Sequence, residues 1–563
     1  MTKSQQRIPA LLLAWAALLA PVAAEPLRFT DVTATSGIDL VSTSGRQPSR
    51  DILEVNGGGL ALLDFDRDGD LDLFLANGAT LDDPEQGPGS RLYSNNGDGT
   101  FEDVSGRVGL TLRRWAMGVA VGDYDGDGDD DLYVTCFGPN VLLRNEIDVT
   151  GRFVDATAAA GVGDARWSTS AAFGDVDADG DLDLYVANYL EFDPAQPPDR
   201  RGRMFMGVPV MAGPSGLKAQ ADVLYENLGG GTFREATSAR GCVPAQPGYG
   251  LGVRLFDFDR DGWQDIFVGN DSQENFLFHN LGAGKFKEVG VVSGIASNYD
   301  GGNQATMGIA LADVDGNGYA DVFTTNFSSD TNTLHLKLEG RWFDDRTSQF
   351  GLGLVSRPFL GWGAGFYDFD SDADEDLFVA NGHVYPEAAG GKMDTDYEQP
   401  PLLFERRGKR FERVLDAGAI GATPYSGRAT AFGDIDDDGD VDVIMTTLNG
   451  KPRVFRNDSP QRGVVVVELR DRRGSRHPQG SVVELTAATG VQRRWVGGGS
   501  FQSVDAPVAY FGLGPADSAS LKLRVVWSDG TAVEHSNLPV GRRLTVTRGS
   551  TKLETMPLGG RKR

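Results

Sequence analysis

The stretch Asp123-Tyr-Asp125-Gly-Asp127-Gly128-Asp-Asp-Asp131 contains the feature that decides how this chain folds. Carboxylates occupy positions 1, 3, 5 and 9, and the glycine at position 6 permits a sharp turn. Calcium takes roughly six to eight oxygen ligands, and carboxylates at alternating positions of a tight loop can point at one centre. Position 7 can add a backbone carbonyl, and Asp131 can close the site with both oxygens. A solvated acidic turn would explain one such stretch, but it does not explain a repeated one.

Six further stretches repeat this spacing, so chance is a poor explanation. The fifth has the neutral Asn317 at position 5, which keeps an oxygen ligand but removes one charge. The sixth has Ala373 at position 6, where a Cβ strains a left-handed turn by about 1 kcal/mol. We therefore expect the sixth site to be the weakest. The spacing predicts up to seven calcium ions, and the candidate metal-ligating residues are Asp64, Asp66, Asp68, Asp70 and Asp72; Asp123, Asp125, Asp127, Asp129 and Asp131; Asp175, Asp177, Asp179, Asp181 and Asp183; Asp257, Asp259, Asp261, Trp263 and Asp265; Asp313, Asp315, Asn317, Tyr319 and Asp321; Asp368, Asp370, Asp372, Asp374 and Asp376; and Asp434, Asp436, Asp438, Asp440 and Asp442.

An EF-hand is the alternative calcium loop, and it needs a glutamate at position 12 and a helix on each side. The first loop has Leu75 at position 12. Its flanks, 60–63 and 73–76, are apolar runs of strand length. These loops are therefore expected to join two strands.

Each loop belongs to a longer repeat. A motif such as Phe101-Glu-Asp-Val-Ser105, with a glycine four residues later, precedes most of the loops. Strand-like runs enter and leave each loop, and a further run such as Leu92-Tyr-Ser-Asn95 leads into a Gly-rich hairpin turn. Repeats of this length with four short strands each are typical of a β-propeller.

Over residues 27–458 these repeats resemble FG-GAP repeats, also called integrin α-type or VCBS-like repeats, whose calcium loops have the form D-x-D-x-D-G-x-x-D. The resemblance implies a seven-bladed propeller with a calcium-binding hairpin loop in each blade. No phenylalanine motif follows the seventh loop, while an extra one stands at 28–32. We therefore predict that this N-terminal segment pairs with the blade of the seventh loop and covers its open edge.

The longest gap between loops contains a Pro-rich insertion, Glu191–Ala221, with the basic run Arg200-Arg201-Gly-Arg203. It is either a solvated connection or a binding loop on one face of the propeller, because long loops on rigid scaffolds often carry function.

After residue 458 the acidic loops stop and alternating strands begin, at 464–469, 481–485, 491–495, 521–526 and 544–546. The blocks Gly474-Ser-Arg476, Gly497–Ser503, Phe511–Gly514 and Val526–Gly530 resemble the ASPIC/UnbV domain, which follows FG-GAP repeats in the cartilage acidic protein family. His477-Pro478 departs from the pattern of that domain, so the resemblance gives no surface role for this turn.

We predict an all-β fold, a seven-bladed β-propeller followed by a small, sandwich-like all-β domain. The expected divisions are 1–24 (signal peptide), 25–458 (propeller), 459–549 (ASPIC/UnbV domain) and 550–563 (disordered tail).

The acidity of the chain is explained locally by the loops. The net charge is −27, and seven calcium ions would bring it to about −13. Such a balance argues against nucleic acid as a partner, since its binders carry basic patches. The two cysteines, Cys136 and Cys242, are too few for a disulfide framework, although one bridge stays open.

Residues 1–24 have the basic start, short apolar core and small residues near Ala24 that are typical of a cleaved secretory signal. The apolar run is shorter than the roughly 20 residues that span a membrane. We expect a mature chain without a membrane span, periplasmic or extracellular, and monomeric.

Three functions stay open. The first is a secreted calcium-binding scaffold for an unknown protein or glycan ligand. The second is a propeller enzyme, such as a polysaccharide lyase or hydrolase, and the third is an accessory protein of a biosynthetic pathway. The common catalytic motifs are absent from the sequence, and its five histidines are scattered, with His383 just after the sixth loop. A calcium scaffold without a catalytic set is therefore the preferred interpretation.

Overall fold

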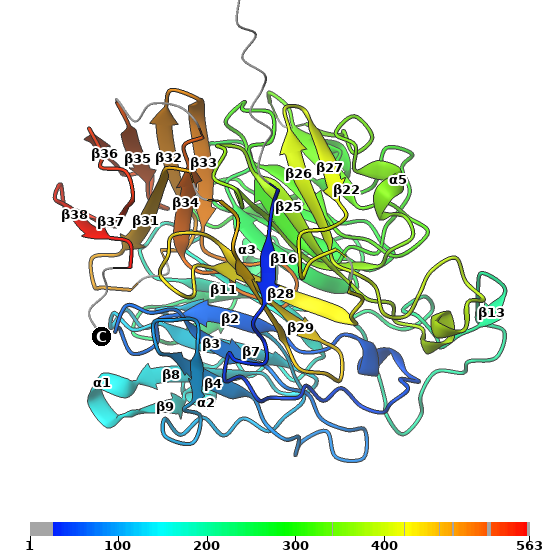
Figure 1. Cartoon of the computed structure of the whole chain (residues 1–563). Helices are drawn as coiled ribbons and strands as arrows, with labels where there is room; N and C mark the ends of the chain where they lie inside the picture. Colours follow the sequence, from blue (N-terminus) through cyan, green and yellow to red (C-terminus); the bar gives the residue numbers. More distant parts are fainter. Residues whose placement is uncertain are drawn as a thin grey trace, which may run out of the picture.

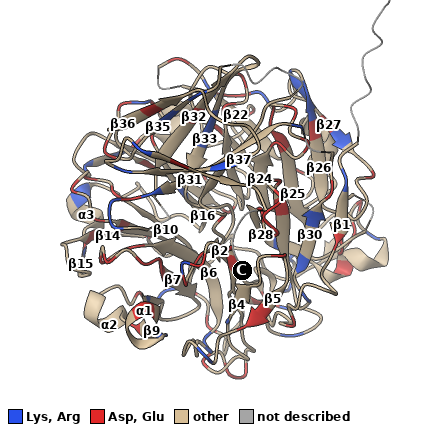
Figure 2. Cartoon of the chain, turned by 60° about the vertical axis from the view of Figure 1, so that its left-hand side comes forward, with Lys and Arg blue, Asp and Glu red and all other residues tan. Residues whose placement is uncertain are grey.

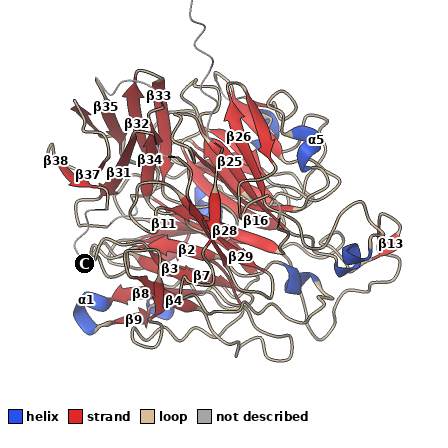
Figure 3. Ribbon diagram, in the orientation of Figure 1, coloured by secondary structure: helices blue, strands red, loops and turns tan. Residues whose placement is uncertain are grey.

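A computed structural model describes residues 26–559, apart from 341, 422, 461, 476, 477 and 515–519. The predicted signal peptide therefore lies outside the described residues. Strands dominate the described part (Figure 3), which confirms the predicted all-β class. No helix in this part is long and apolar enough to cross a membrane. The short helices are α1 (Ile147–Thr150), α2 (Thr157–Ala160), α3 (Thr237–Arg240), α4 (Gly290–Ser293) and α5 (Gly353–Ser356), with 3-10 turns at Ile52–Val55 and Pro386–Gly390.

Seven four-stranded antiparallel sheets, each with one Asp loop between its first and second strands, form the N-terminal part. From the inner strand outwards they are β2 (Leu60–Leu63), β3 (Asp72–Leu75), β4 (Arg91–Asn95) and β5 (Phe101–Asp103); β6 (Ala116–Gly122), β7 (Asp131–Cys136), β8 (Val141–Glu146) and β9 (Arg152–Asp155); β10 (Ser168–Gly174), β11 (Asp183–Asn188), β14 (Val223–Asn227) and β15 (Phe233–Glu235); β16 (Gly250–Phe256), β17 (Asp265–Asn270), β18 (Phe276–Asn280) and β19 (Phe286–Glu288); β20 (Ile309–Ala312), β21 (Asp321–Thr324), β22 (Thr333–Lys337) and β23 (Phe343–Asp345); β24 (Gly361–Tyr367), β25 (Asp376–Asn381), β26 (Leu402–Arg407) and β27 (Arg410–Val414); and β28 (Gly427–Gly433), β29 (Asp442–Thr447), β30 (Arg453–Asn457) and β1 (Phe29–Asp31).

The inner strands of these sheets close a ring. β2 contacts β6, and the contacts continue through β10, β16, β20, β24 and β28 back to β2. Apolar side chains fill the space between neighbouring sheets, for example in the cluster that joins Phe74 of the first sheet to Val134 of the second. The arrangement is that of a β-propeller.

Strands from both ends of the ring complete the last sheet, as predicted. Phe29 lies opposite Asn457 and Thr30 opposite Arg456 in an antiparallel pair between β1 and β30. Phe29 is buried, and its ring packs edge-on against Phe369 with the centroids 5.4 Å apart. The N-terminal segment thus closes the ring with an aromatic anchor as well as with backbone hydrogen bonds.

The C-terminal part is a two-sheet sandwich with one core, which confirms the predicted sandwich. Three of its strands, β34 (Val508–Gly512), β36 (Ala532–Ser536) and β38 (Leu553–Pro557), were missing from the sequence prediction. The prediction of a disordered tail from residue 550 is wrong for its described part, because β38 pairs with β37 in an antiparallel ladder. One sheet has the order β34 (Val508–Gly512), β31 (Val464–Arg470), β37 (Arg542–Thr547) and β38 (Leu553–Pro557), and the other β33 (Gly490–Val496), β32 (Ser481–Ala487), β35 (Lys522–Val526) and β36 (Ala532–Ser536).

The segment 497–506, which joins β33 to β34, enters the centre of the ring, and we call it the plug. On one side of the channel, Leu62 N–H donates to Val504 O and Val504 N–H donates to Leu60 O, so the plug bridges to β2. These contacts join the plug to a strand that lies more than 400 residues earlier in the sequence.

Across the channel, the plug contacts the inner strands of two further sheets. Ser500 Oγ accepts the backbone N–H groups of Ile309 and Ala364 at 3.1 and 3.0 Å. The ring of Phe501 packs on Trp362 with the centroids 4.9 Å apart. The cavities left around the plug measure only about 50 and about 20 Å³. The plug therefore fills the channel between these strands.

The Pro-rich insertion lies on the face of the ring opposite the Asp loops. Each Asp loop joins the first and second strands of its sheet, whereas the insertion joins the second and third strands of the third sheet. Because neighbouring strands are antiparallel, successive connections lie at opposite ends of the sheet, so the insertion lies on the face away from the Asp loops. It contains the short hairpin β12 (Met204–Phe205) and β13 (Val208–Pro209), seen far from the C-terminal sandwich in Figure 1. Phe205 packs on Phe327 and Tyr385, which belong to the fifth and sixth repeats, with centroids 5.5 Å apart in each pair. The insertion thus spans the ring face.

The placement of the plug can be tested at Gly59. This glycine lies against the plug, and its backbone is not in the left-handed conformation. A Cβ at Gly59 would stand 1.9 Å from Gln502 O, whereas one at Gly106 would meet no atom within 4 Å. We expect Gly59→Ala to lower the free energy of unfolding by about 1–3 kcal/mol, as overpacking does, and Gly106→Ala to change it by about 0.5 kcal/mol or less. Denaturant titrations of the two variants decide this, and equal midpoints would contradict the placement of the plug.

Candidate metal centres

The ninth aspartate of each loop ties that loop to the third strand of its own sheet. In the second loop, Asp131 Oδ2 accepts the N–H of Tyr124 at 3.3 Å, and Oδ1 accepts that of Asn145, at the end of β8, at 2.7 Å. The carboxylate is fully buried. The same pair of bonds recurs in every sheet, at Asp72, Asp183, Asp265, Asp321, Asp376 and Asp442.

The first and fifth positions fix the turn of the loop itself. Asp123 Oδ2 accepts the N–H of Gly128 at 3.0 Å, and Asp127 Oδ1 accepts that of Asp129 at 3.1 Å. All seven loops repeat both bonds. Residue 6 has a φ near +100° in the glycine loops, and Ala373 is held at +85°. The left-handed turn expected at Ala373 is therefore confirmed, while the affinity of its site stays a prediction.

Sequence reasoning missed a link between neighbouring sheets. The Nδ2 group of Asn145 donates at 2.8 Å to Phe65 O, the second residue of the preceding loop. The equivalent bond is made by Asn95, Asn227, Asn280 and Asn457, and in the sixth sheet by Arg406. A recurring Asn at the end of the third strand was the available signal.

The loops bring carboxylate oxygens together in a way that fits a cation. Oxygens of positions 1, 3 and 9 lie within 4.8 Å of one another in the first and third loops, and those of positions 1, 3 and 5 do so in the second. Among the described residues, at least one buried carboxylate oxygen in each of five loops has no hydrogen-bond donor, for example Asp66 Oδ1, Asp123 Oδ1, Asp177 Oδ1, Asp313 Oδ1 and Asp436 Oδ1. A buried acceptor without a donor is costly, and a cation at the centre of the loop would satisfy it.

Burial raises the pKa values of several loop carboxyls, and repulsion from neighbouring carboxylates adds to this effect. The pKa of Asp123 is raised to about 7, that of Asp175 to about 6 and that of Asp183 to about 8. Without a cation, these loops cannot hold all of their charge at neutral pH.

The loops differ in which positively charged side chains contact them. The sandwich lies on the loop face, and Figure 2 shows its basic segments beside acidic segments of the ring. Arg493 on β33 contacts Asp313 of the fifth loop at 2.7 Å, and Arg543 on β37 contacts Asp434 of the seventh at 3.1 Å. Arg240 in α3 contacts Asp177 of the third loop at 2.7 Å. In the fourth loop the side chain that faces the carboxylates is a histidine.

Other sequence candidates have structural roles. His383 is fully buried, with Nε2 2.9 Å from Ser328 Oγ and Nδ1 accepting the N–H of Tyr385. Cys136 and Cys242 are both buried and free, so they form no bridge with each other. The side chains of Trp263 and Tyr319, at position 7 of their loops, offer no carboxylate, so only their carbonyls remain as ligands.

Family comparisons agree with this architecture. The FG-GAP-like repeat family matches residues 64–134, 127–186, 215–268 and 257–324, and the ASPIC and UnbV family matches residues 471–553. The chain thus contains FG-GAP-like repeats and a C-terminal ASPIC and UnbV domain. Among curated proteins it is similar to cartilage acidic protein 1 of Mus musculus, with 25% identity over 507 residues, 85% of this chain and 71% of the relative. The Homo sapiens protein of the same name is 26% identical over 503 residues, 85% of this chain and 70% of the relative.

Two solved structures have weaker likenesses. One is an Agrocybe aegerita lectin described as recognising non-reducing terminal N-acetylglucosamine, with 14% identity and a TM-score of 0.35 over 64% of this chain and 83% of that chain. The other is YCF48 bound to a D1 peptide, with 7% identity and a TM-score of 0.40 over 78% of this chain and 100% of that chain. Likenesses of this degree carry no information on ligands.

Substitution of the ninth aspartate of a loop and of a candidate ligand at position 3 should have different effects on stability. Asp131→Asn removes an acceptor of backbone N–H groups, so we expect it to destabilise the protein by about 1–3 kcal/mol with or without calcium. Asp125→Asn removes a candidate ligand whose ion pair with the half-exposed Arg144 is 4.0 Å long, so we expect a loss of stability in calcium and little change, or a gain, in chelator. Thermal melts in calcium and in chelator test this prediction. Equal changes of melting temperature in the two variants under both conditions would contradict it.

The raised pKa values also predict a pH dependence for the calcium-free protein. The folded state binds protons more tightly than the unfolded state, whose carboxyls keep a pKa near 3.8. The extra stability is therefore complete below about pH 4 and is lost as the pH rises towards 8. In chelator we expect the melting temperature to fall between pH 5 and 8, and in millimolar calcium we expect this fall to shrink. A melting temperature in chelator that rises over this range would contradict the assignment.

Proposed function

We propose that the protein is a secreted, calcium-binding propeller scaffold that holds out a surface for a protein or glycan ligand. The observation that carries the proposal is the sevenfold repetition of one loop geometry, in which carboxylate oxygens gather within 4.8 Å of one another and several are buried without a donor. The oxygens at positions 1, 3 and 5 and the carbonyl at position 7 would hold each ion, with the ninth carboxylate closing the loop. Bound calcium supplies positive charge that stabilises these carboxylates in their ionised form.

The ligand surface is proposed to lie on the face opposite the loops. The sandwich covers the loop face and the plug fills the channel, which disfavours an enzyme whose substrate enters from that face. On the other face, the insertion exposes Met204 and Met206, whose side chains are 56% and 42% accessible, beside the basic Arg201. Exposed apolar residues on a loop that is itself anchored to a rigid scaffold are typical of binding sites. This favours the binding-loop interpretation of the insertion.

Calcium binding is tested by calorimetry and thermal melts of the mature chain. Extracellular calcium modules bind at about 10⁻⁴ to 10⁻³ M, so we expect saturation in the millimolar range and a melting temperature many degrees lower in chelator. Fewer than seven ions are expected at the lower calcium concentrations. The sixth loop holds Ala373 in a strained left-handed turn, and the fifth has lost one charge at Asn317 and has a second partly neutralised by Arg493. An unchanged melt in excess chelator would refute the proposal.

The ligand surface is tested by screening glycans and extracellular proteins with the wild type and a Met204→Ser, Met206→Ser variant. Val491→Ser on the sandwich is a matched control, since Val491 is 43% accessible and lies in the other domain. Binding lost in the double variant and kept in the control is the expected result. A ligand that binds both variants equally would place its site elsewhere.

A further inference from the structure

The fourth loop differs from the other six in the residue that faces it from the third strand. His279 on β18 stands one residue before the strand's terminal Asn280. The equivalent residues in the other sheets, in ring order, are Ser94, Arg144, Glu226, Leu336, Glu405 and Arg456. The fourth loop is therefore the only one of the seven with an imidazole at this place.

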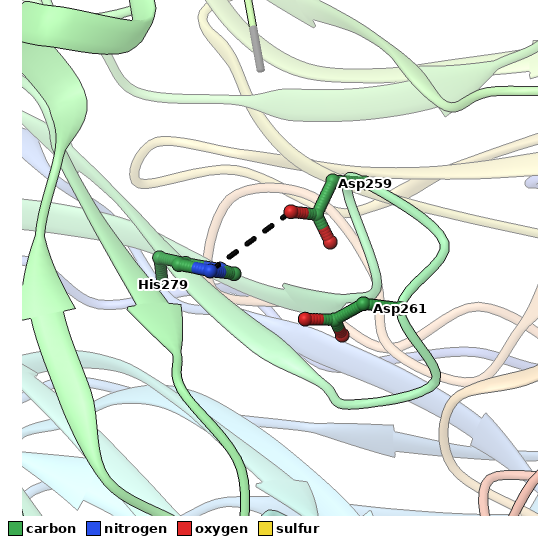
Figure 4. A group of neighbouring side chains, drawn as sticks. All are labelled: Asp259, Asp261 and His279. Carbon is green, nitrogen blue, oxygen red and sulfur yellow. Dashed lines mark ion pairs between the residues drawn. The ribbon is translucent and has the colours of Figure 1, made fainter. Parts of the chain in front are cut away.

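The imidazole of His279 is 1% accessible and is directed into the loop (Figure 4). Its Nδ1 lies 3.1 Å from Asp265 Oδ1, and its Nε2 lies 3.9 Å from Asp259 Oδ2. One ligand atom each of Asp259, Asp261 and His279 fall within 4.8 Å of one another. A nitrogen and two carboxylates thus surround one point.

The contact with Asp265 sets the orientation of the ring. When Asp265 is ionised it accepts from Nδ1–H, and in that tautomer the lone pair is on Nε2, the nitrogen 3.9 Å from Asp259. A carboxylate that holds the far nitrogen of a histidine in this way is the usual support of a metal-ligating imidazole. Phe258 packs edge-on against the ring at 5.4 Å and keeps it in place.

A simple counter-charge would explain the histidine less well. Arg144 and Arg456 occupy the same place in other sheets, but their side chains are 37% and 43% accessible, so their charge stays in water. A buried imidazolium would give up that hydration. Moreover, 3.9 Å is too long for a hydrogen bond to Asp259. Ligand atoms around one zinc ion lie about 3.4 Å apart, so small side-chain rotations would close this set.

We propose that the fourth loop is a mixed nitrogen–oxygen site that binds a borderline divalent cation of the zinc class through His279, Asp259 and Asp261. Imidazole nitrogen is a ligand that zinc prefers and that calcium, which takes oxygen, does not. The inference rests on the proposed function in one respect, that the loops bind cations. It assigns to one loop an ion different from that of the other six.

The experiment is a calorimetric titration of the calcium-saturated mature chain with Zn²⁺. We expect one equivalent to bind, with an affinity at least about 100-fold higher than in His279→Ser. Serine stands at this place in the first sheet, so the fold accepts it. His535→Ala, on the sandwich, is the control for adventitious zinc and should leave the site intact. Asp261→Asn, at an exposed position of the loop, is a second variant that should also weaken zinc.

A second readout follows the ligand type directly. Co²⁺ in place of zinc should give a visible absorption band that depends on His279 and is absent in His279→Ser. Zinc affinity unchanged in His279→Ser, or zinc lost in His535→Ala, would overturn the proposal. Wild type that binds calcium but no zinc would refute this inference and leave the calcium scaffold standing. A wild type that binds zinc but no calcium would support this inference and refute the calcium scaffold.

Discussion

The hydrogen bonds of one buried aspartate, the ninth residue of each loop, hold the rest of the structure in register. Its two oxygens accept one N–H from the loop and one from the third strand, as Asp131 does from Tyr124 and Asn145. The side-chain amide of that same Asn145 then reaches the loop of the preceding sheet. A single carboxylate therefore connects turn, strand and neighbouring sheet, and repetition of the unit produces the ring. Because this carboxylate is buried, its charge must be compensated, which the cation proposed at the centre of the loop would do.

The parts of the structure that could be predicted are those written in local spacing. The Asp loops, the strands beside them and the pairing of Phe29 with the last sheet all follow from motifs counted along the chain. What could not be predicted depends on contacts between distant residues. Nothing near Ser500 indicates that it meets Ile309 and Ala364 in a channel. His279 was similarly seen as one of five scattered histidines, because its relation to Asp259 exists only after β18 pairs with β17.

The two domains are joined by charge as well as by the plug. Arg543 is almost fully buried and contacts Asp434, Asp437 and Glu468 at 3.1, 2.6 and 2.9 Å. A buried arginine of this kind is tolerated only with its partners in place, and removing them leaves an uncompensated charge. The sandwich therefore supplies counter-charge that the seventh loop uses, and its position on the ring is fixed by more than apolar contact.

Closure of the ring by β1 has a consequence for the order in which the chain folds. Thr30 hydrogen-bonds to Asp458, 428 residues later, so the first strand has no partner until nearly the whole propeller has been synthesised. Contacts of such separation slow folding, and an unpaired strand edge is open to wrong partners while it waits. The plug arrives later still, after residue 496. A nascent chain of this design therefore spends its synthesis as an open arc, and the ring becomes complete only when its last strand and its central segment have both emerged.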